Sequence, residues 1–186
     1  LDFYIAKCRQ SSSDPNDLRR IDELFINDGT YKFKEAAAER GVANGWQTWT
    51  ASFGDIDNDG DLDIMGVNRQ SKKINAYIND GTNNYTTNQI SVSTLNKTIV
   101  SFKADDIDGD GDGDFCIGYG SFFDEQIVLL INKDQNKFDT IIISKDDFKS
   151  LNKIDLIDLN KDSKLDIVGS NSNDCLVAWL NKGSNK

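Results

Sequence analysis

Residues 106–114 read Asp-Ile-Asp-Gly-Asp-Gly-Asp-Gly-Asp, which places a carboxylate at every second position of a nine-residue stretch. Two further stretches have the same spacing, 55–63 (DIDNDGDLD) and 158–166 (DLNKDSKLD). The three stretches begin 51 and then 52 residues apart. A constant period of this length is typical of repeat proteins built from stacked supersecondary units, such as propeller blades.

Short apolar segments recur at fixed places between these acidic loops. Four segments belong to each period, and the Asn-Asp-Gly and Asn-Lys-Gly turns that follow the second segment favour tight hairpins. The first and second segments lie at 62–67, 74–78, 115–119, 126–131, 165–169 and 175–180. The third and fourth segments lie at 49–54, 85–92, 99–104, 138–144 and 153–157. We therefore predict an all-β fold of propeller blades, each with four short antiparallel strands in about 52 residues.

The same frame divides the chain into four parts. We predict a partial blade over 1–48 with an insertion loop over 8–20, followed by a blade over 49–98 that contains loop 55–63. The next blade covers 99–152 with loop 106–114, and a second partial blade covers 153–186 with loop 158–166. The chain would then span roughly three and a half blades of a larger propeller, and the remaining blades of a parent chain would be its neighbours.

Two features of the first part are open to interpretation. Residues 1–6 align with 62–67, which makes Asp2 the counterpart of Asp63. The insertion 8–20 is either a binding loop or a simple surface loop. Residues 34–40 (KEAAAER) are good helix formers before Gly41, and we expect one or two helical turns there.

The spacing in each loop suits a hard cation bound by oxygen. When such a loop curls around one ion, side chains at positions 1, 3 and 5 face inward, glycine at 6 permits a sharp bend, position 7 offers its carbonyl and position 9 a carboxylate. The predicted ligands of the first two loops are Asp55, Asp57, Asp59, the carbonyl of Asp61, Asp63, Asp106, Asp108, Asp110, the carbonyl of Asp112 and Asp114. Those of the third loop are Asp158, Asn160, Asp162, the carbonyl of Lys164 and Asp166.

Calcium is the predicted ion, with two sites and a third, weaker one. Five or more protein oxygens in a flexible loop suit calcium better than magnesium. The third loop has Ser163 in place of glycine and Asn160 in place of a carboxylate, so its affinity should be lowest. An EF-hand is excluded because position 12 is Gly66 or Ile117 rather than glutamate. The alternative is that the loops are acidic turns that bind no ion.

The composition narrows the functional classes. The formal net charge is −10, and 5, 5 and 3 of the 31 acidic residues lie in the three loops. This charge disfavours nucleic acid as a partner, and no apolar run approaches the length of a membrane helix, so we expect no membrane insertion. The chain contains no histidine, which removes the commonest general base. Its three cysteines, Cys8, Cys116 and Cys175, show no metal-binding spacing and are expected to be buried apolar side chains.

The acidic loops and their flanks resemble a known repeat family. Loop 55–63 follows Ser52-Phe-Gly-Asp55 and precedes Leu62-Asp-Ile64, and this pattern resembles the FG-GAP/VCBS repeats of integrin α-subunits. The stretches 24–29, 33–41 and 46–63 are closer to the ASPIC/UnbV and cartilage-acidic-protein-like branch. The resemblance implies a β-propeller with structural calcium and an extracellular or cell-surface location, but it implies no single activity.

Two functions remain after these exclusions. The first is a calcium-stabilised, secreted or cell-surface binding and adhesion module that recognises a protein or a glycan. The second is a catalytic or non-catalytic propeller domain of a larger secreted enzyme. We expect no catalytic residues in this chain, because its carboxylate clusters are already assigned to metal ions and no nucleophile with an acid/base partner is recognisable.

Overall fold

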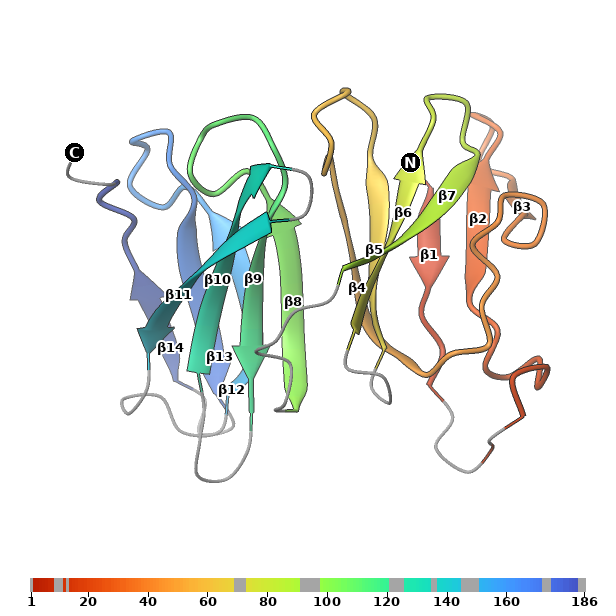
Figure 1. The fold of residues 1–186 in the computed structure, drawn as a ribbon, viewed down its shortest axis with the longest axis horizontal. Helices are drawn as coiled ribbons and strands as arrows, with labels where there is room; N and C mark the ends of the chain where they lie inside the picture. The colour runs from red at the N-terminus through yellow and green to blue at the C-terminus, as the bar shows by residue number, and fades with distance from the viewer. Residues whose placement is uncertain are drawn as a thin grey trace. The chain divides into compact units, whose positions relative to one another are not determined.

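The computed structural model describes residues 2–8, 12, 14–68, 73–90, 98–120, 126–134, 137–144, 151–171 and 175–183, with the side chains of 134 and 144 excepted. Among these residues every regular element is a β-strand, fourteen in all (Figure 1). The strands form four small antiparallel sheets, in which neighbours in space are neighbours in sequence. This meander is the strand order of a propeller blade, and it confirms the predicted all-β fold.

Two of the sheets have four strands and two have three. The four-stranded sheets are β4 (Thr48–Gly54), β5 (Asp63–Asn68), β6 (Lys73–Asn79) and β7 (Tyr85–Ile90), and β8 (Ile99–Asp105), β9 (Asp114–Tyr119), β10 (Gln126–Asp134) and β11 (Lys137–Ser144). The three-stranded sheets are β1 (Phe3–Ile5), β2 (Glu23–Asn27) and β3 (Phe33–Glu35), and β12 (Leu151–Ile157), β13 (Asp166–Asn171) and β14 (Leu176–Trp179).

Burial explains the sequence of the central strands. Every residue of β5 and of β9 is buried, whereas β11 exposes most of its described side chains. A strand covered on both faces needs a nearly continuous apolar run, which 63–68 (DIMGVN) and 114–119 (DFCIGY) provide after their first Asp. The acidic loops 55–63 and 106–114 thus end where a fully buried strand begins.

The chain forms two compact units, Leu1–Ala51 with Asp61–Val92, and Ser52–Gly60 with Ser93–Lys186. In the first unit a small core joins Leu24 of β2 to Ile64 of β5 and Tyr77 of β6. Beside this core lies Asp22, which is fully buried. Its carboxylate accepts hydrogen bonds from the Tyr4 hydroxyl (2.6 Å), the Thr48 hydroxyl (2.5 Å), the Asn44 amide (2.8 Å) and the backbone N–H of Lys7 (2.7 Å).

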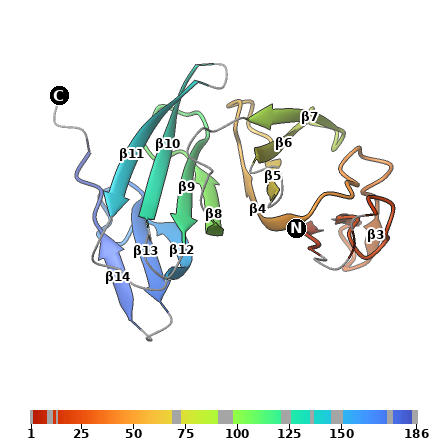
Figure 2. The same cartoon turned by 60° about the horizontal axis from the view of Figure 1, so that its bottom comes forward.

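In the second unit the sheet β8–β11 packs beside the sheet β12–β14, as Figure 2 shows. The core between them contains Ile127 and Leu129 of β10, Ile154 of β12 and Ile167 of β13. The hydroxyl of Ser101 accepts a hydrogen bond from the backbone N–H of Ile154 at 3.0 Å, which ties β8 to β12. These contacts position the second and third acidic loops, which both lie in this unit.

Two expectations about local structure change, and a third falls partly outside the described residues. Residues 34 and 35 belong to β3, and the predicted helical turns reduce to one turn in which the backbone N–H of Arg40 bonds the carbonyl of Ala36 at 2.9 Å. Strand pairing with β2 takes precedence over helix propensity here. Of the cysteines only Cys116 is buried, and Cys175 is exposed. Residues 9–11 and 13 of the insertion 8–20 lie outside the described residues.

Candidate metal centre

The first residue of each acidic loop organises the turn through its carboxylate. In the second loop Asp106 accepts hydrogen bonds from the backbone N–H groups of Gly109 (2.7 Å) and Gly111 (3.0 Å). The residue at position 6 makes this bond in the other loops as well. The distances are 2.9 Å from Gly60 to Asp55 and 2.9 Å from Ser163 to Asp158. The three loops therefore share one backbone turn.

This turn requires left-handed backbone angles at positions 4 and 6. In the second loop Gly109 and Gly111 have φ values of 81° and 97°. The other loops adopt the same region with φ of 59° at Asn58, 91° at Gly60, 63° at Lys161 and 65° at Ser163. Glycine enters this region without a steric penalty and asparagine does so more readily than most residues, so the third loop bears the largest conformational cost.

The last residue of each loop ties the loop to the following hairpin. Asp63, Asp114 and Asp166 are all fully buried. Each accepts a hydrogen bond from the backbone N–H of the asparagine that directly follows the second segment of its period. The bonds are Asn79 to Asp63 (2.8 Å), Asn132 to Asp114 (2.8 Å) and Asn181 to Asp166 (2.7 Å). Asn27 makes the same bond to Asp2 (2.8 Å), so the aligned N-terminal residue occupies the same structural position.

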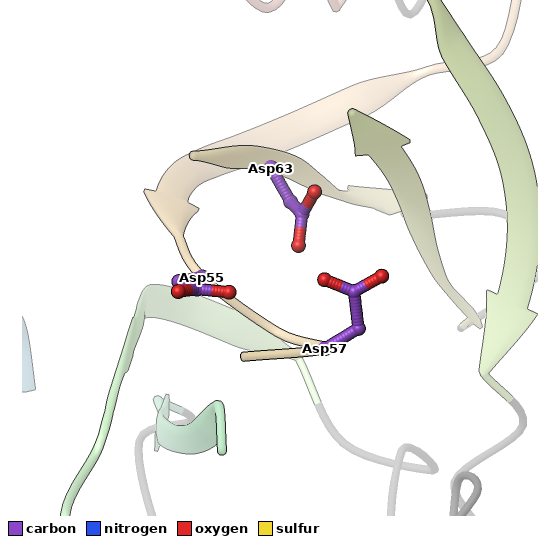
Figure 3. Close-up of side chains that lie close together, drawn as sticks. All are labelled: Asp55, Asp57 and Asp63. Carbon is purple, nitrogen blue, oxygen red and sulfur yellow. The ribbon is translucent and has the colours of Figure 1, made fainter. Parts of the chain in front are cut away.

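The first and second loops each bring three of their own carboxylates together. Asp55, Asp57 and Asp63 each offer one oxygen, and these oxygens lie within 4.8 Å of one another (Figure 3). Asp106, Asp108 and Asp114 do the same in the second loop. These are positions 1, 3 and 9 in both cases. The residue at position 1 is partly buried, the one at 3 is exposed and the one at 9 is buried, so each cluster runs from solvent into the protein.

In the second loop, burial and neighbouring carboxylates raise the pKa values of two acidic residues. Burial raises the pKa of Asp114 to about 6, against the hydrogen bonds from Asn132 and Ile107 that lower it. Burial, followed by the hydrogen bond and the charge of Asp110, raises the pKa of Asp112 to about 6 as well. One buried oxygen of Asp112, Oδ1, has no hydrogen-bond partner. A group of carboxylates with these properties is stabilised by a cation among them.

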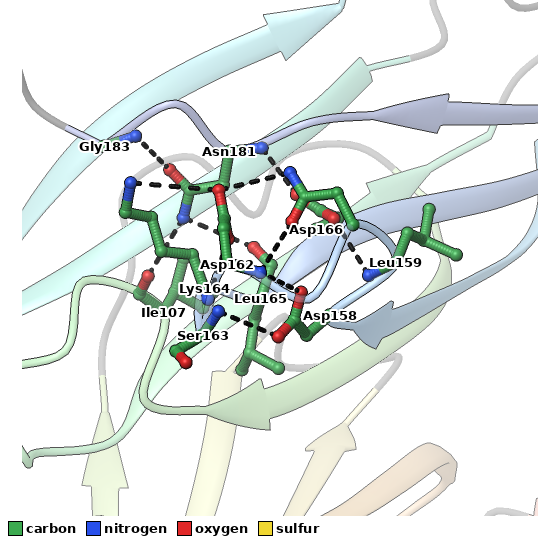
Figure 4. A network of polar contacts seen from close by, with 11 residues as sticks. Ile107, Asp158, Leu159, Asp162, Ser163, Lys164, Leu165, Asp166, Asn181 and Gly183 are labelled. Carbon is green, nitrogen blue, oxygen red and sulfur yellow. Dashed lines mark hydrogen bonds and ion pairs between the residues drawn. The ribbon is translucent and has the colours of Figure 1, made fainter.

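The third loop keeps the turn but not the cluster. Figure 4 shows Asp158 bound to the backbone of Ser163, and Asp166 accepting from the backbone N–H groups of Leu159 (3.0 Å) and Asn181. The side chain of Asp162 instead accepts a hydrogen bond from the amide of Asn160 at 3.1 Å. Among the described residues, the acidic groups of this loop do not form a group of three within 4.8 Å.

Comparison with known families agrees with the loop geometry. Residues 1–66 match the FG-GAP-like repeat, and this match ends just after the first acidic loop. Residues 1–66, about a third of the chain, are therefore similar to an FG-GAP-like repeat. No curated protein matches the sequence. The narrower ASPIC/UnbV branch stays a prediction.

The donor atoms of the two clustered loops fit a hard divalent cation. Each three-carboxylate cluster offers only oxygen, which is the ligand type of calcium and magnesium rather than of soft transition metals. Two loops with different residues at positions 4 and 8 reach the same arrangement of positions 1, 3 and 9. Because the same three positions converge in both loops, their carboxylates are suited to the same role, that of metal ligands.

Not every predicted ligand lies in these clusters. The side chain of Asp110 is exposed and accepts the backbone N–H of Asp112 (3.2 Å), and Asp59 is also exposed and donates its backbone N–H to Asp55 (3.2 Å). Ligation through position 5 and through the carbonyls of Asp61, Asp112 and Lys164 therefore stays a prediction. In the third loop Asp158 and Asp166 accept backbone N–H groups, whereas Asn160 and Asp162 bond each other through their side chains.

Two residue types of the site are not apparent from the acidic spacing. The asparagines that bind position 9 act through their backbone N–H, and the only signal for them is their recurrence after the second strand. The other is Lys133, whose ammonium lies 2.8 Å from Oδ2 of Asp108 although the two residues are 25 positions apart. No period in the sequence connects a lysine near the end of β10 with a carboxylate in the acidic loop.

Proposed function

We propose that this chain belongs to the FG-GAP repeat family and is a calcium-stabilised, non-catalytic binding module of a secreted or cell-surface protein, and that its ligand is a protein or a glycan. The observation that carries the proposal is the pair of three-carboxylate clusters, built from the same positions of two loops one repeat apart. Repeats of this family are typical of extracellular proteins, where calcium is present at millimolar concentration. No part of the described chain forms a helix of the length and apolarity needed to cross a bilayer.

Asp114 links the second cluster to the sheet. One carboxylate oxygen accepts the N–H of Asn132 near the end of β10, and the other accepts those of Ile107 (2.9 Å) and Asp108 (3.2 Å) in the loop. A bound calcium ion would supply the positive charge that offsets the repulsion among the carboxylates. Because Asp114 contacts both loop and strand, stabilisation of the loop is transmitted to the hairpin of β9 and β10.

The size of the expected stabilisation follows from mass action. A site with a dissociation constant of about 0.1 mM, in about 1 mM calcium, stabilises the folded state by roughly 1.4 kcal/mol. Two such sites would contribute about 3 kcal/mol, which is a large part of the net stability of a domain. The module would therefore be rigid outside the cell and less stable where calcium is scarce.

Isothermal titration calorimetry tests the metal part of this proposal. Calcium titrated into the wild-type chain should bind at two sites in the range of about 10 μM to 1 mM, and magnesium should bind more weakly. Asp57→Asn and Asp108→Asn should each remove one site, because each removes a carboxylate from one cluster. Asp139→Asn, in exposed β11, is the matched control and should leave both sites intact. Two sites that survive in the Asp57→Asn/Asp108→Asn double variant would contradict the assignment.

A glycan array and a panel of extracellular matrix proteins test the binding part. The wild-type chain should bind a defined ligand in calcium and lose it in chelator, and the double variant should bind it weakly under both conditions. Equal binding by the wild type and the double variant would show that ligand recognition does not depend on calcium. Calcium-dependent turnover of a substrate, without retention of a ligand, would favour the enzyme-domain alternative.

A further inference from the structure

The two carboxylate clusters differ in the side chain that the following hairpin directs toward them. In the second repeat Lys133 follows Asn132, and its ammonium forms an ion pair of 2.8 Å with Asp108. Asp108 is one of the three residues of the second cluster. The side chains of Lys133 and Asp108 retain 45% and 33% of their exposure, so the ammonium can leave the carboxylate without unfolding the loop.

The first repeat has an acidic residue at the matching place. Asp80 follows Asn79 as Lys133 follows Asn132. The Asp80 carboxylate accepts hydrogen bonds from the backbone N–H (2.9 Å) and the hydroxyl (2.6 Å) of Thr82, so it is engaged in its own turn. The same position thus carries a positive charge in one repeat and a negative charge in the other.

A cation held beside a metal site has two effects on it. It neutralises part of the carboxylate charge when no metal is bound, and it repels an incoming divalent ion. Both effects lower the affinity for the metal, because the ion gains less on binding and must separate the ion pair. The same contact supports the ion-free loop, since it offsets repulsion between Asp108 and its acidic neighbours.

We propose that Lys133 is a tethered counter-ion of the second loop, which sets that loop to bind calcium more weakly than the first and to depend less on calcium for its fold. This inference rests on the proposed calcium sites and adds their ranking. The first loop would fill at lower calcium concentration, and the second would respond to calcium at higher concentration. The chain would then have one structural and one regulatory calcium site of otherwise matching design.

The test is calcium titration of Lys133→Met by calorimetry, with thermal unfolding in calcium and in chelator. The variant should bind calcium at the second loop about three- to tenfold more tightly than the wild type. In chelator its melting temperature should be slightly lower than that of the wild type, whereas the rise caused by calcium should be larger. These opposite signs separate a counter-ion from a residue that only supports the fold.

Three further proteins make the test specific. Lys103→Met removes a comparable ion pair, Lys103 with Asp155 at 2.9 Å, and should leave calcium affinity unchanged. Lys133→Arg retains the charge and should bind calcium like the wild type. In an Asp108→Asn background, Lys133→Met should have no effect on calcium binding.

The possible failures can be told apart. Calcium binding by both the wild type and Lys133→Met with equal affinity would overturn the role of Lys133 and leave the calcium sites standing. The same gain of affinity in Lys103→Met would also overturn it, because the effect would then be one of net charge. Absence of calcium binding in every protein would overturn the proposed sites together with this inference.

Discussion

The second and third acidic loops have the same backbone and different side-chain chemistry. In both, position 1 binds the N–H of position 6, at 3.0 Å and 2.9 Å, and position 9 is fully buried and binds the N–H of an asparagine. Only the second loop brings three carboxylates together. At position 3 it has Asp108, whereas the third loop has Asn160. The comparison indicates that hydrogen bonds shape the turn, and that the capacity to hold a metal depends on a few side chains added to it.

The largest expected effect comes from position 9, because both loops depend on it. Asp114→Ala would leave three backbone N–H groups without their acceptor, and Asp166→Ala would leave two. Each variant should lose about 2–4 kcal/mol of unfolding free energy in chelator, measured by urea denaturation. Asp139→Ala in exposed β11 should change it by less than about 0.5 kcal/mol. If Asp166→Ala leaves the free energy of unfolding unchanged, the turn of the third loop does not need this carboxylate.

The pH dependence of the melting temperature should have opposite signs in chelator and in calcium. The folded, calcium-free protein has Asp114 and Asp112 at pKa values of about 6, above the value of about 3.9 in an unfolded chain. Their protonation therefore favours the folded state, and this contribution is lost as the pH rises through 6. In chelator the melting temperature should be a few degrees higher at pH 5 than at pH 7.5. In millimolar calcium the order should reverse, because protons compete with the ion.

The absence of histidine makes this pH experiment easy to interpret, since no imidazole titrates in the same range. Asp114→Asn serves as its control, because an amide at this position cannot titrate. A melting temperature in chelator that falls between pH 7.5 and pH 5 would contradict the raised pKa values.

Exchange of position 3 between the two loops tests what distinguishes them. Asp108→Asn should abolish the calcium-dependent stabilisation of the second loop, about 1.4 kcal/mol in about 1 mM calcium. Asn160→Asp should add a carboxylate to the third loop and create or strengthen a response to calcium there. Differential scanning calorimetry in calcium and in chelator measures both changes. If Asn160→Asp adds no calcium response, position 3 is not the deciding difference.

The smallest effect is expected at position 6 of the third loop, and position 6 of the second loop should respond with the opposite sign. Ser163 has φ of 65°, a region that costs a non-glycine residue about 1–2 kcal/mol, so Ser163→Gly should stabilise the protein by about 0.5–1 kcal/mol. Gly111 has φ of 97°, and a Cβ there would lie 2.9 Å from the amide nitrogen of Asn58. Gly111→Ala should therefore destabilise the protein by about 1–2 kcal/mol. Urea denaturation in chelator measures both, and changes of the same sign would contradict this view of the turn.

Much of the fold follows from the repeat in the sequence. The spacing of the acidic loops, the apolar segments between them and the Asn-Asp-Gly turns were sufficient to predict strands, hairpins and the equivalence of Asp2 with Asp63. These signals are local, and local backbone preference agrees with the final fold at these places. At residues 34–40 the two disagree, because helix propensity competes with pairing of β3 to β2, and the pairing prevails.

The site is only partly predictable for a different reason. Positions 1, 3 and 9 were among the predicted ligands, but nothing in the spacing separates them from position 5, which is exposed in both loops. The bond from Asn132 to Asp114 uses a backbone N–H, which every residue except proline offers. The contact between Lys133 and Asp108 depends on how β10 returns to the loop, and side chains 25 residues apart meet only once that hairpin is formed.

The central claim is that the first two loops bind calcium and that this binding stabilises the fold, and thermal unfolding of the wild-type chain tests it most directly. The melting temperature is measured in millimolar calcium, in millimolar magnesium and in chelator. We predict a melting temperature roughly 5–10 °C higher in calcium than in chelator, from about 3 kcal/mol of binding free energy, with a smaller rise in magnesium. A cooperative transition at the same temperature in all three conditions would contradict the claim and would leave the loops as acidic turns.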